Sequence, residues 1–203
     1  MLSALTQTGH ASAPAFAAAA ASDEILLSRI ARGDAVAMRA LVARHQTRVY
    51  RWILRFVRDA ALAEDVLNEV FLDVWRQAAS FAGRSSVATW VLAIARFKAL
   101  TAARKRIDVQ LDEDGAASIP DPADNAEKVL EREDERKLLR AGLAALSREH
   151  REVLDLVYYH GKSIKDVAEV IGIPEATVKT RMFYARKKLS ELLKEQGIDR
   201  GWP

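Results

Sequence analysis

The chain has 203 residues, of which 50% are apolar and 29% charged, enough to bury the cores of one or two small domains. This composition excludes a wholly disordered or fibrous protein. Thirty-one Lys and Arg against 28 Asp and Glu leave a net charge of +3, so a surface for a polyanion must come from how the charges are distributed. The chain has no cysteine, which excludes disulfides and thiol catalysis. Because the four histidines lack metal-ligand spacing, we expect no metal and no cofactor: His10, His45, His150 and His160.

The first 22 residues carry no charged side chain and end in an alanine run. They lack the cationic start and the continuous apolar core of a signal peptide, so they predict a disordered, low-complexity tail. No later stretch approaches the ~18 to 20 apolar residues that a bilayer span requires. We therefore expect a soluble, cytoplasmic protein with no membrane insertion.

A helical pattern begins at Asp23, with apolar residues three and four positions apart and almost no alternating runs typical of strands. Gly33 and Asp34 predict a break between a short first helix and a long second one. Asp59 predicts the next break, before a third helix that begins near Leu62.

A further break at residues 80–86 precedes a fourth helix, predicted from about Val87 to Arg106. Residues 107–129 then hold two prolines, one glycine and seven acidic residues against a single lysine, which predicts a flexible acidic linker. We predict an all-α protein with two small helical domains. The expected bounds are a tail at 1–22, a first domain at 23–106, the linker at 107–129, a second domain at 130–196 and a tail at 197–203.

The second domain contains a predicted helix-turn-helix at residues 161–189, GKSIKDVAEVIGIPEATVKTRMFYARKKL. Ser163 can cap a short helix with Asp166 three residues later, and Gly172 can end that helix in a left-handed conformation. Pro174 can then open the next helix. The expected buried faces are Val167, Ala168 and Ile171 on the first helix, and Val178, Met182, Ala185 and Leu189 on the second.

On the outer face of that second helix, Glu175 is the only acid among five bases. Such a helix fits the major groove of DNA, where it supplies phosphate contacts and side chains that reach base edges. The alternative is an ordinary αα-hairpin with a solvated basic face. The predicted DNA contacts of this motif are Lys162, Ser163, Glu175, Thr177, Lys179, Thr180, Arg181, Arg186 and Lys187.

An acidic stripe lies on the predicted third helix, in the sequence EDVLNEVFLDVWRQ. Asp65, Glu69 and Asp73 fall four residues apart, so each neighbouring pair costs a few tenths of a kcal/mol. Arg76 relieves only one end of the stripe, and Trp75 is expected to be partly exposed. A lone acidic stripe is more commonly a solvated face, and the alternative, to which the neighbouring Trp75 points, is a surface that a protein partner covers.

The third candidate segment joins the loop at 80–86 to the fourth helix. Residues 96–106 contain five bases and no acid, with aromatic residues nearby. Aromatic and basic side chains together suit single-stranded nucleic acid, since bases stack on rings and the backbone follows positive charge. The alternative is that Trp90 and Phe97, seven residues apart, belong to the core.

Together these segments resemble an extracytoplasmic-function (ECF) RNA polymerase sigma factor of the sigma-70 family, over about residues 23–195. The segments AEDVLNEVFLDVW, SSVATWVLAIARFKAL and GIPEATVKTRMFYARKKL carry the resemblance in that order. It implies a sigma region 2-like first domain and a sigma region 4-like second domain. It further implies that the helix with the acidic stripe docks on the clamp helices of the polymerase largest subunit. The implied polymerase-binding residues are Asp65, Glu69, Phe71, Asp73, Trp75 and Arg76.

The resemblance also implies that the third segment opens the −10 promoter element and holds its non-template strand. A flipped base would enter the loop near Ala82 to Ser86, at a cost of a few kcal/mol that a preformed pocket returns. Where the family commonly has Asn this chain has Phe97, so the polar contacts of that Asn are not expected here. The implied −10 contacts are Phe81, Gly83, Arg84, Ser85, Ser86, Thr89, Trp90, Arg96, Lys98, Arg104, Lys105 and Arg106.

The helix-turn-helix would read the −35 element as duplex. We thus predict a non-enzymatic promoter-specificity subunit, with partners that are core RNA polymerase (clamp helices and flap), promoter DNA and an anti-sigma factor. A stand-alone helix-turn-helix regulator is the main alternative, but it would need to dimerise and leaves the acidic stripe unexplained. An enzyme is disfavoured because no nucleophile with a base and no phosphate-binding glycine loop is present. A helical adaptor remains the third alternative.

Overall fold

The computed structural model describes residues 21–112 and 141–195, which belong to two separate compact units. Every regular element within these two ranges is a helix, in agreement with the predicted all-α class. None of the described helices is both long enough and apolar enough to cross a membrane. The predicted tail at 197–203, nearly all of the tail at 1–22 and most of the predicted linker lie outside the described residues.

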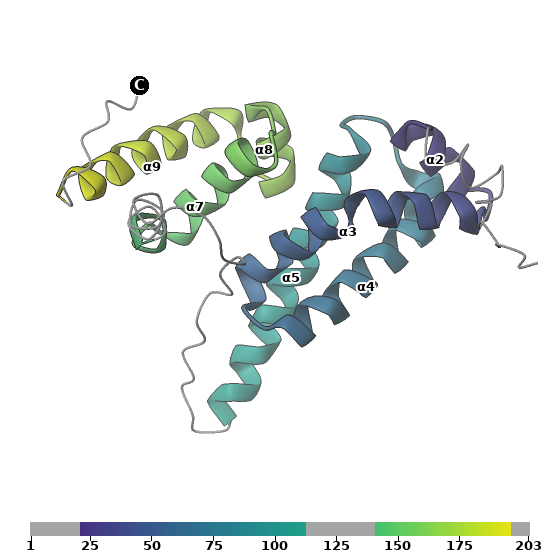
Figure 1. The fold of residues 1–203 in the computed structure, drawn as a ribbon, viewed down its shortest axis with the longest axis horizontal. Coiled ribbons are helices and arrows are strands. Elements are labelled where there is room, and N and C mark those ends of the chain that lie inside the picture. Colours follow the sequence, from purple (N-terminus) through teal and green to yellow (C-terminus); the bar gives the residue numbers. More distant parts are fainter. Residues whose placement is uncertain (1–20, 113–140, 196–203) are drawn as a thin grey trace, which may run out of the picture. The chain divides into compact units, whose positions relative to one another are not determined.

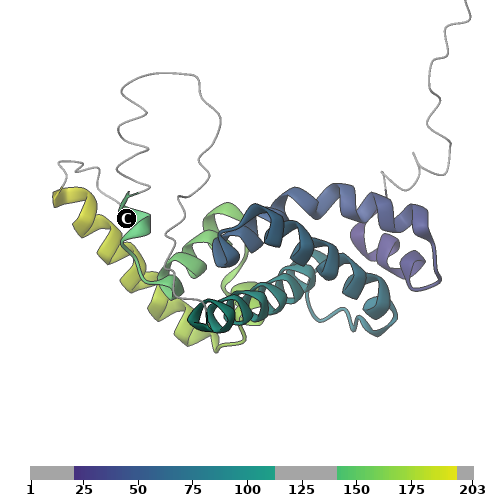
Figure 2. The ribbon, with the colours of Figure 1, turned by 90° about the horizontal axis from the view of Figure 1, so that it is seen from below.

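The first unit is a bundle in which α3, α4 and α5 pack against one another, as Figure 1 shows. The short helix α2 packs on α3 and also contacts η1 and α5. Figure 2 shows the same bundle from below, with α2 beside one end of α3. The elements are α2 (Asp23–Ile30), α3 (Ala35–Val57), α4 (Ala60–Gln77), the short 3-10 helix η1 (Ala78–Ser80) and α5 (Val87–Asp112).

Aspartate side chains start the second and third helices at the predicted breaks. Asp34 Oδ1 accepts a hydrogen bond from the backbone N–H of Val36 at 2.8 Å, and Asp59 Oδ1 accepts one from Leu62 at 3.0 Å. These bonds satisfy N–H groups that have no partner inside the first turn. Because the cap is Asp59 itself, α4 begins at Ala60, slightly before the predicted start.

Helix α5 is longer than predicted. It continues past Arg106 to Asp112, so the first residues assigned to the linker are helical. No Gly or Pro interrupts the chain between Arg106 and Gly115, which leaves the helix without a stop signal there. The rest of the predicted linker lies outside the described residues.

The core of the first unit is built from one face of each helix. Trp52 of α3 is almost fully buried, and its Nε1 donates a hydrogen bond to the carbonyl of Leu92 on α5 at 3.3 Å. Burial of each large apolar side chain stabilises the unit by about 1.5 to 3 kcal/mol. Other buried members are Leu26, Leu27, Ile30, Leu41, Val49, Ile53, Val57, Val66, Val70, Val74, Val87, Val91 and Leu92.

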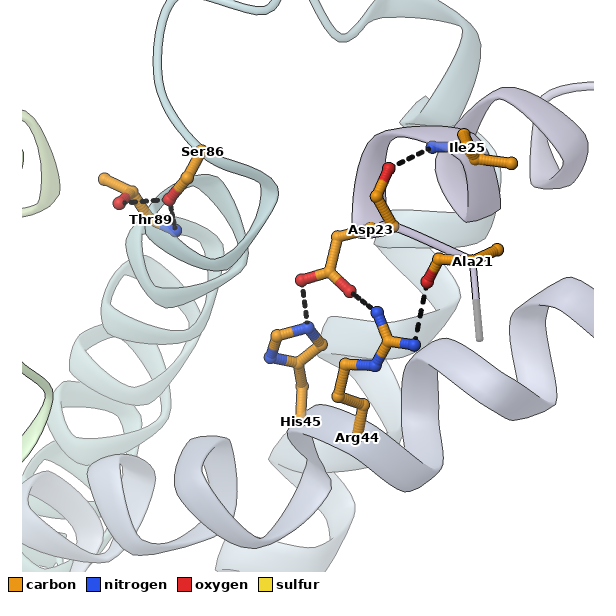
Figure 3. Close-up of polar contacts among 8 residues, drawn as sticks. Ala21, Asp23, Ile25, Arg44, His45, Ser86 and Thr89 are labelled. Atoms are coloured by element: carbon orange, nitrogen blue, oxygen red, sulfur yellow. Dashed lines mark hydrogen bonds and ion pairs between the residues drawn. The ribbon is translucent and has the colours of Figure 1, made fainter. Parts of the chain in front are cut away.

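Polar contacts of Asp23 hold the start of α2 against α3 (Figure 3). Asp23 Oδ2 lies 2.7 Å from Nε2 of the buried His45, and the other carboxylate oxygen pairs with Arg44. Arg44 also donates to the carbonyl of Ala21 at 2.9 Å. One carboxylate thus holds two consecutive residues of α3 and keeps the apolar face of α2 on the core.

The second unit contains α7 (Arg148–Leu154), the π-helix η2 (Asp155–Tyr159), α8 (Ile164–Ile171) and α9 (Glu175–Glu195), and residues 141–144 are also helical. Helix α7 packs on α9, and α8 packs on both η2 and α9. Gly142 approaches α9 so closely that a β-carbon there would lie 2.9 Å from Leu189 Cδ1. A larger residue at position 142 would therefore force the side chain of Leu189 to shift.

Candidate functional site

The predicted helix-turn-helix is present in the second unit. The backbone N–H of Asp166 donates to Ser163 Oγ at 3.1 Å, and the N–H of Ser163 donates back to Asp166 Oδ2 at 3.3 Å. This reciprocal capping box starts α8. Gly172 ends the helix with φ 77°, and its N–H donates to the carbonyl of Ala168 at 2.9 Å. The turn therefore follows from the residues that predicted it.

The buried faces of the two helices agree with the prediction except at one position. Val170, not Ala168, is buried on α8, because the i, i+3, i+4 set that includes Val167 and Ile171 faces α9 while Ala168 is turned partly away. Pro174 stands just before α9, where its carbonyl accepts a hydrogen bond from the N–H of Val178. The buried stripe of α9 is Val178, Met182, Ala185, Leu189 and Leu193.

Most of the predicted DNA contacts on α9 are exposed to solvent. Thr177 and Arg181 are half-buried. The pKa of Glu149 on α7 is lowered mainly by hydrogen bonds from its own N–H and from Ser147, and the positive charge of Arg181 helps to lower it further. Lys162 is half-buried, and the hydroxyl of Ser163 is bound to Asp166, so Ser163 positions α8. The exposed members are Glu175, Lys179, Thr180, Arg186 and Lys187.

Two exposed aromatic residues on α9 were missed by the sequence interpretation. Phe183 and Tyr184 are 58% and 53% exposed, with ring centroids 5.4 Å apart in an edge-to-face arrangement. They follow Thr180 by three and four residues, which places them on the same outward face. That spacing is the signal that could have found them.

Helix α4 presents a mixed acidic and apolar outer face. Leu72 is 46% exposed and Trp75 is 36% exposed, which confirms the expected exposure of Trp75. Phe71 is only 6% exposed, so its side chain lies in the core, and its contact with polymerase stays a prediction. Leu72 was missed, although it lies four residues from Asn68 and from Arg76. We define the α4 outer face as Asp65, Asn68, Glu69, Leu72, Trp75 and Arg76.

The acidic stripe has a counter-charge within the first unit that the sequence did not predict. Lys98 of α5 places its Nζ 2.9 Å from Asp73 Oδ2 and 3.4 Å from Glu69 Oε2. The pKa of Lys98 is raised, first by its hydrogen bond with Asp73 and then by the nearby negative charges. Asp73 is therefore tied to α5, whereas Asp65 and Glu69 lie on the exposed surface.

The loop before α5 has an exposed tip and a buried base. Arg84 is exposed and Ser85 half-buried, whereas Phe81 packs on Trp90 with ring centroids 5.2 Å apart. Thr89 is fully buried, and its Oγ1 lies 2.8 Å from Ser86 Oγ (Figure 3). The side chain of Thr89 thus serves the helix start, and its contact with DNA stays a prediction. Ser86 Oγ also accepts the N–H of Thr89 at 3.2 Å.

Some basic side chains of α5 are exposed to solvent, and others bind carboxylates of the same unit. Arg104 and Lys105 are exposed, Arg96 is half-buried, and Phe97 is 70% exposed, so Phe97 is not a core residue. Arg106 Nη1 donates to Asp59 Oδ2 at 3.0 Å. Two of the five predicted bases, Lys98 and Arg106, thus bind carboxylates inside the unit.

Comparison with known proteins identifies the family. Residues 41–107 match the family model Sigma-70 region 2, and residues 136–189 match the model Sigma-70, region 4. The chain is 34% identical over 179 residues to ECF RNA polymerase sigma factor SigL of Mycobacterium tuberculosis, across 86% of this chain and 98% of SigL. This chain belongs to the ECF sigma factors of the sigma-70 family.

Two solved structures are similar to this chain over most of its length. CnrH in complex with the cytosolic domain of CnrY is 25% identical with a TM-score of 0.62, across 85% of this chain and 97% of CnrH. The sigma factor RpoE of Bartonella quintana, in complex with the anti-sigma factor NepR, is 26% identical with a TM-score of 0.62, across 78% and 96%. As an ECF sigma factor, the chain is a non-enzymatic subunit of transcription initiation that confers promoter specificity on RNA polymerase. The predicted family and function are confirmed, and the family implies that the chain binds core RNA polymerase.

Proposed function

We propose that the α4 outer face is the surface by which this sigma factor docks on the clamp helices of the polymerase largest subunit. The observation that carries this proposal is the pairing of exposed carboxylates with exposed apolar side chains on one helix. Asp65 and Glu69 lie on the same face as Leu72 and Trp75. Aromatic anchors within a charged rim are typical of protein interfaces, and the acids select basic partners.

The two units divide promoter recognition between them in this proposal. Residues 23–106 act as the region 2-like domain on the −10 element, and residues 130–196 act as the region 4-like domain on the −35 element. The exposed loop tip at Arg84 and Ser85 takes the extruded base, and the exposed Phe97 stacks on a neighbouring one. Exposed Arg104 and Lys105 follow the phosphates of the non-template strand.

The outward face of α9 reads the −35 duplex. Lys179 and Arg186 reach the groove or its phosphates, and the adjoining Phe183 and Tyr184 supply apolar contacts to base edges. We propose further that the second unit contacts the polymerase flap. An anti-sigma factor as a partner is supported by the solved complex of the sigma factor RpoE with the anti-sigma factor NepR.

The docking proposal is tested by Asp65→Asn with Glu69→Gln in the full chain. We expect the double variant to lose at least tenfold in affinity for core polymerase, because truncating one partner of a buried charge pair costs about 2 to 5 kcal/mol. Glu24→Gln with Glu169→Gln is the matched control, since both of these acids are exposed and lie outside α4. Core affinity is measured by titration of labelled chain with core polymerase. Unchanged affinity of the α4 variant would place the interface elsewhere.

A further inference from the structure

The three acids of the stripe differ in how open they are to a partner. The side chain of Glu69 is 62% exposed, whereas that of Asp73 is 20% exposed and bound to Lys98. A cation from another protein can reach Glu69 from solvent. It cannot reach Asp73 without displacing the ammonium of Lys98, which lies closer to Asp73 than to Glu69.

Lys98 is itself held in place. Its side chain is 24% exposed, and its hydrogen bond with Asp73 anchors the ammonium between α4 and α5. From that position the same ammonium lies within ion-pair distance of Glu69. One negative charge of the α4 outer face is therefore partly neutralised before any partner arrives.

We propose that Lys98 is a tuning residue of the polymerase-docking surface: it competes with the basic groups of core polymerase for Glu69 and thereby limits the affinity of the sigma factor for core. Asp73 acts through Lys98, as the residue that holds the competitor in place. This inference rests on the proposed docking by the α4 outer face. Lys98 was predicted to contact DNA and Asp73 to contact polymerase. In this inference both residues instead position the charges of the docking surface.

If Lys98 competes for Glu69, replacing Lys98 should raise the affinity for core, whereas replacing a residue needed only for packing should not. Removing the Lys98 ammonium leaves Glu69 free for the partner and makes the α4 outer face more negative. Affinity for a basic partner should rise, and it should fall more steeply with added salt. A lysine that merely supports the fold, or one that contacts polymerase directly, would reduce affinity when it is replaced.

The test measures the affinity of the full chain for core polymerase, in the wild type and in charge variants, at two salt concentrations. Lys98→Met keeps the aliphatic stem and removes the charge, and we expect it to tighten core binding about two- to fivefold, the range that exposed ion pairs support. Arg39→Met, which removes an exposed base from α3, is the control and should leave core affinity unchanged. Lys98→Arg keeps the charge and should preserve wild-type affinity.

A double-mutant cycle assigns the effect to Glu69. In the Glu69→Gln background, Lys98→Met should no longer tighten binding, because the contested carboxylate is absent. If Lys98→Met alone fails to fold, the pair Lys98→Met with Asp73→Asn leaves no unpaired half-buried carboxylate, and the same tightening is expected from it. Unchanged or weaker core binding by a folded variant would overturn the inference.

The docking proposal and this inference fail in different ways. If Asp65→Asn with Glu69→Gln leaves core affinity intact, the α4 outer face is not the docking surface. If that variant loses affinity while Lys98→Met does not gain it, the docking surface stands and the role of Lys98 as a competitor is wrong.

Discussion

Arg106 near the end of α5 donates a hydrogen bond from Nη1 to Oδ2 of Asp59 at 3.0 Å, and Asp59 is the residue that caps α4. The guanidinium thus ties the last basic residue of the predicted DNA-binding segment to the start of the helix that carries the acidic face. We predict that Arg106→Gln lowers the melting temperature of the first unit, whereas Arg104→Gln, at an exposed position, leaves it unchanged. Circular dichroism melting of both variants checks this. Equal melting temperatures would make Arg106 a surface residue available to DNA.

Acid should destabilise the first unit through its two aspartate caps. Hydrogen bonds from the helix N–H groups lower the pKa of Asp34 and of Asp59 below the ordinary 3.8. A carboxylate whose pKa is lower in the folded than in the unfolded state stabilises the fold fully above its unfolded pKa. That stabilisation is lost as the pH falls through the folded pKa.

We predict that Asp34→Asn with Asp59→Asn flattens the loss of stability below about pH 4, because Asn keeps the capping hydrogen bonds but does not titrate. Urea unfolding of the full chain, followed from neutral pH to pH 3, measures the difference. A decline as steep as that of the wild type would assign the acid sensitivity to other carboxylates.

The recognition helix should lose affinity and specificity through different residues. Lys187 is exposed on the outer face of α9, so Lys187→Ala should weaken binding to all −35 sequences alike and reduce the salt slope by about one unit. Arg181 lies at the edge of that face near Glu149. We expect Arg181→Ala to cost about 1 to 3 kcal/mol at selected −35 positions only. Binding to a −35 library at two salt concentrations separates the two effects, and identical profiles for both variants would contradict this division.

The loop before α5 should choose between single strands. We predict that Arg84→Ala reduces the preference of the polymerase-bound chain for the non-template −10 strand over its complement, because Arg84 stands at the exposed tip of the loop. Arg32→Ala, which removes an exposed arginine from the turn after α2, serves as the control. Competition between labelled single strands at fixed salt measures the preference. If Arg84→Ala kept the strand preference and only Arg32→Ala lost it, the loop before α5 would not be the base pocket.

Local signals in the sequence were sufficient for the helix boundaries. Asp34, Asp59, Ser163 and Gly172 each place a helix end, because capping and left-handed conformations depend on one or two residues. The buried stripe of α9 follows from periodicity alone. The end of α5 was predicted too early, because the acidic composition after Arg106 was taken as the signal that stops the helix. The helix instead ends at Asp112, shortly before Gly115.

Contacts between helices could not be read from the sequence in the same way. The pairing of Lys98 with Asp73 joins two helices, so its existence depends on how α5 is rotated against α4. The burial of Phe71, by contrast, follows from helical periodicity, which places it on the buried face with Val70 and Val74 and leaves Leu72 exposed. The contact of Thr89 is local too, because its hydroxyl meets that of Ser86 three residues earlier at the start of α5.

Transcription in vitro by core RNA polymerase, with and without the chain, tests promoter specificity most directly. Fragments of the host genome serve as templates, and the 5′ ends of the transcripts are mapped. We predict a set of start sites that requires the chain, with a shared pair of upstream elements, and that is lost with Asp65→Asn and Glu69→Gln. The same start sites with and without the chain, or full activity of the acidic-face variant, would contradict promoter selection through docking of the α4 outer face.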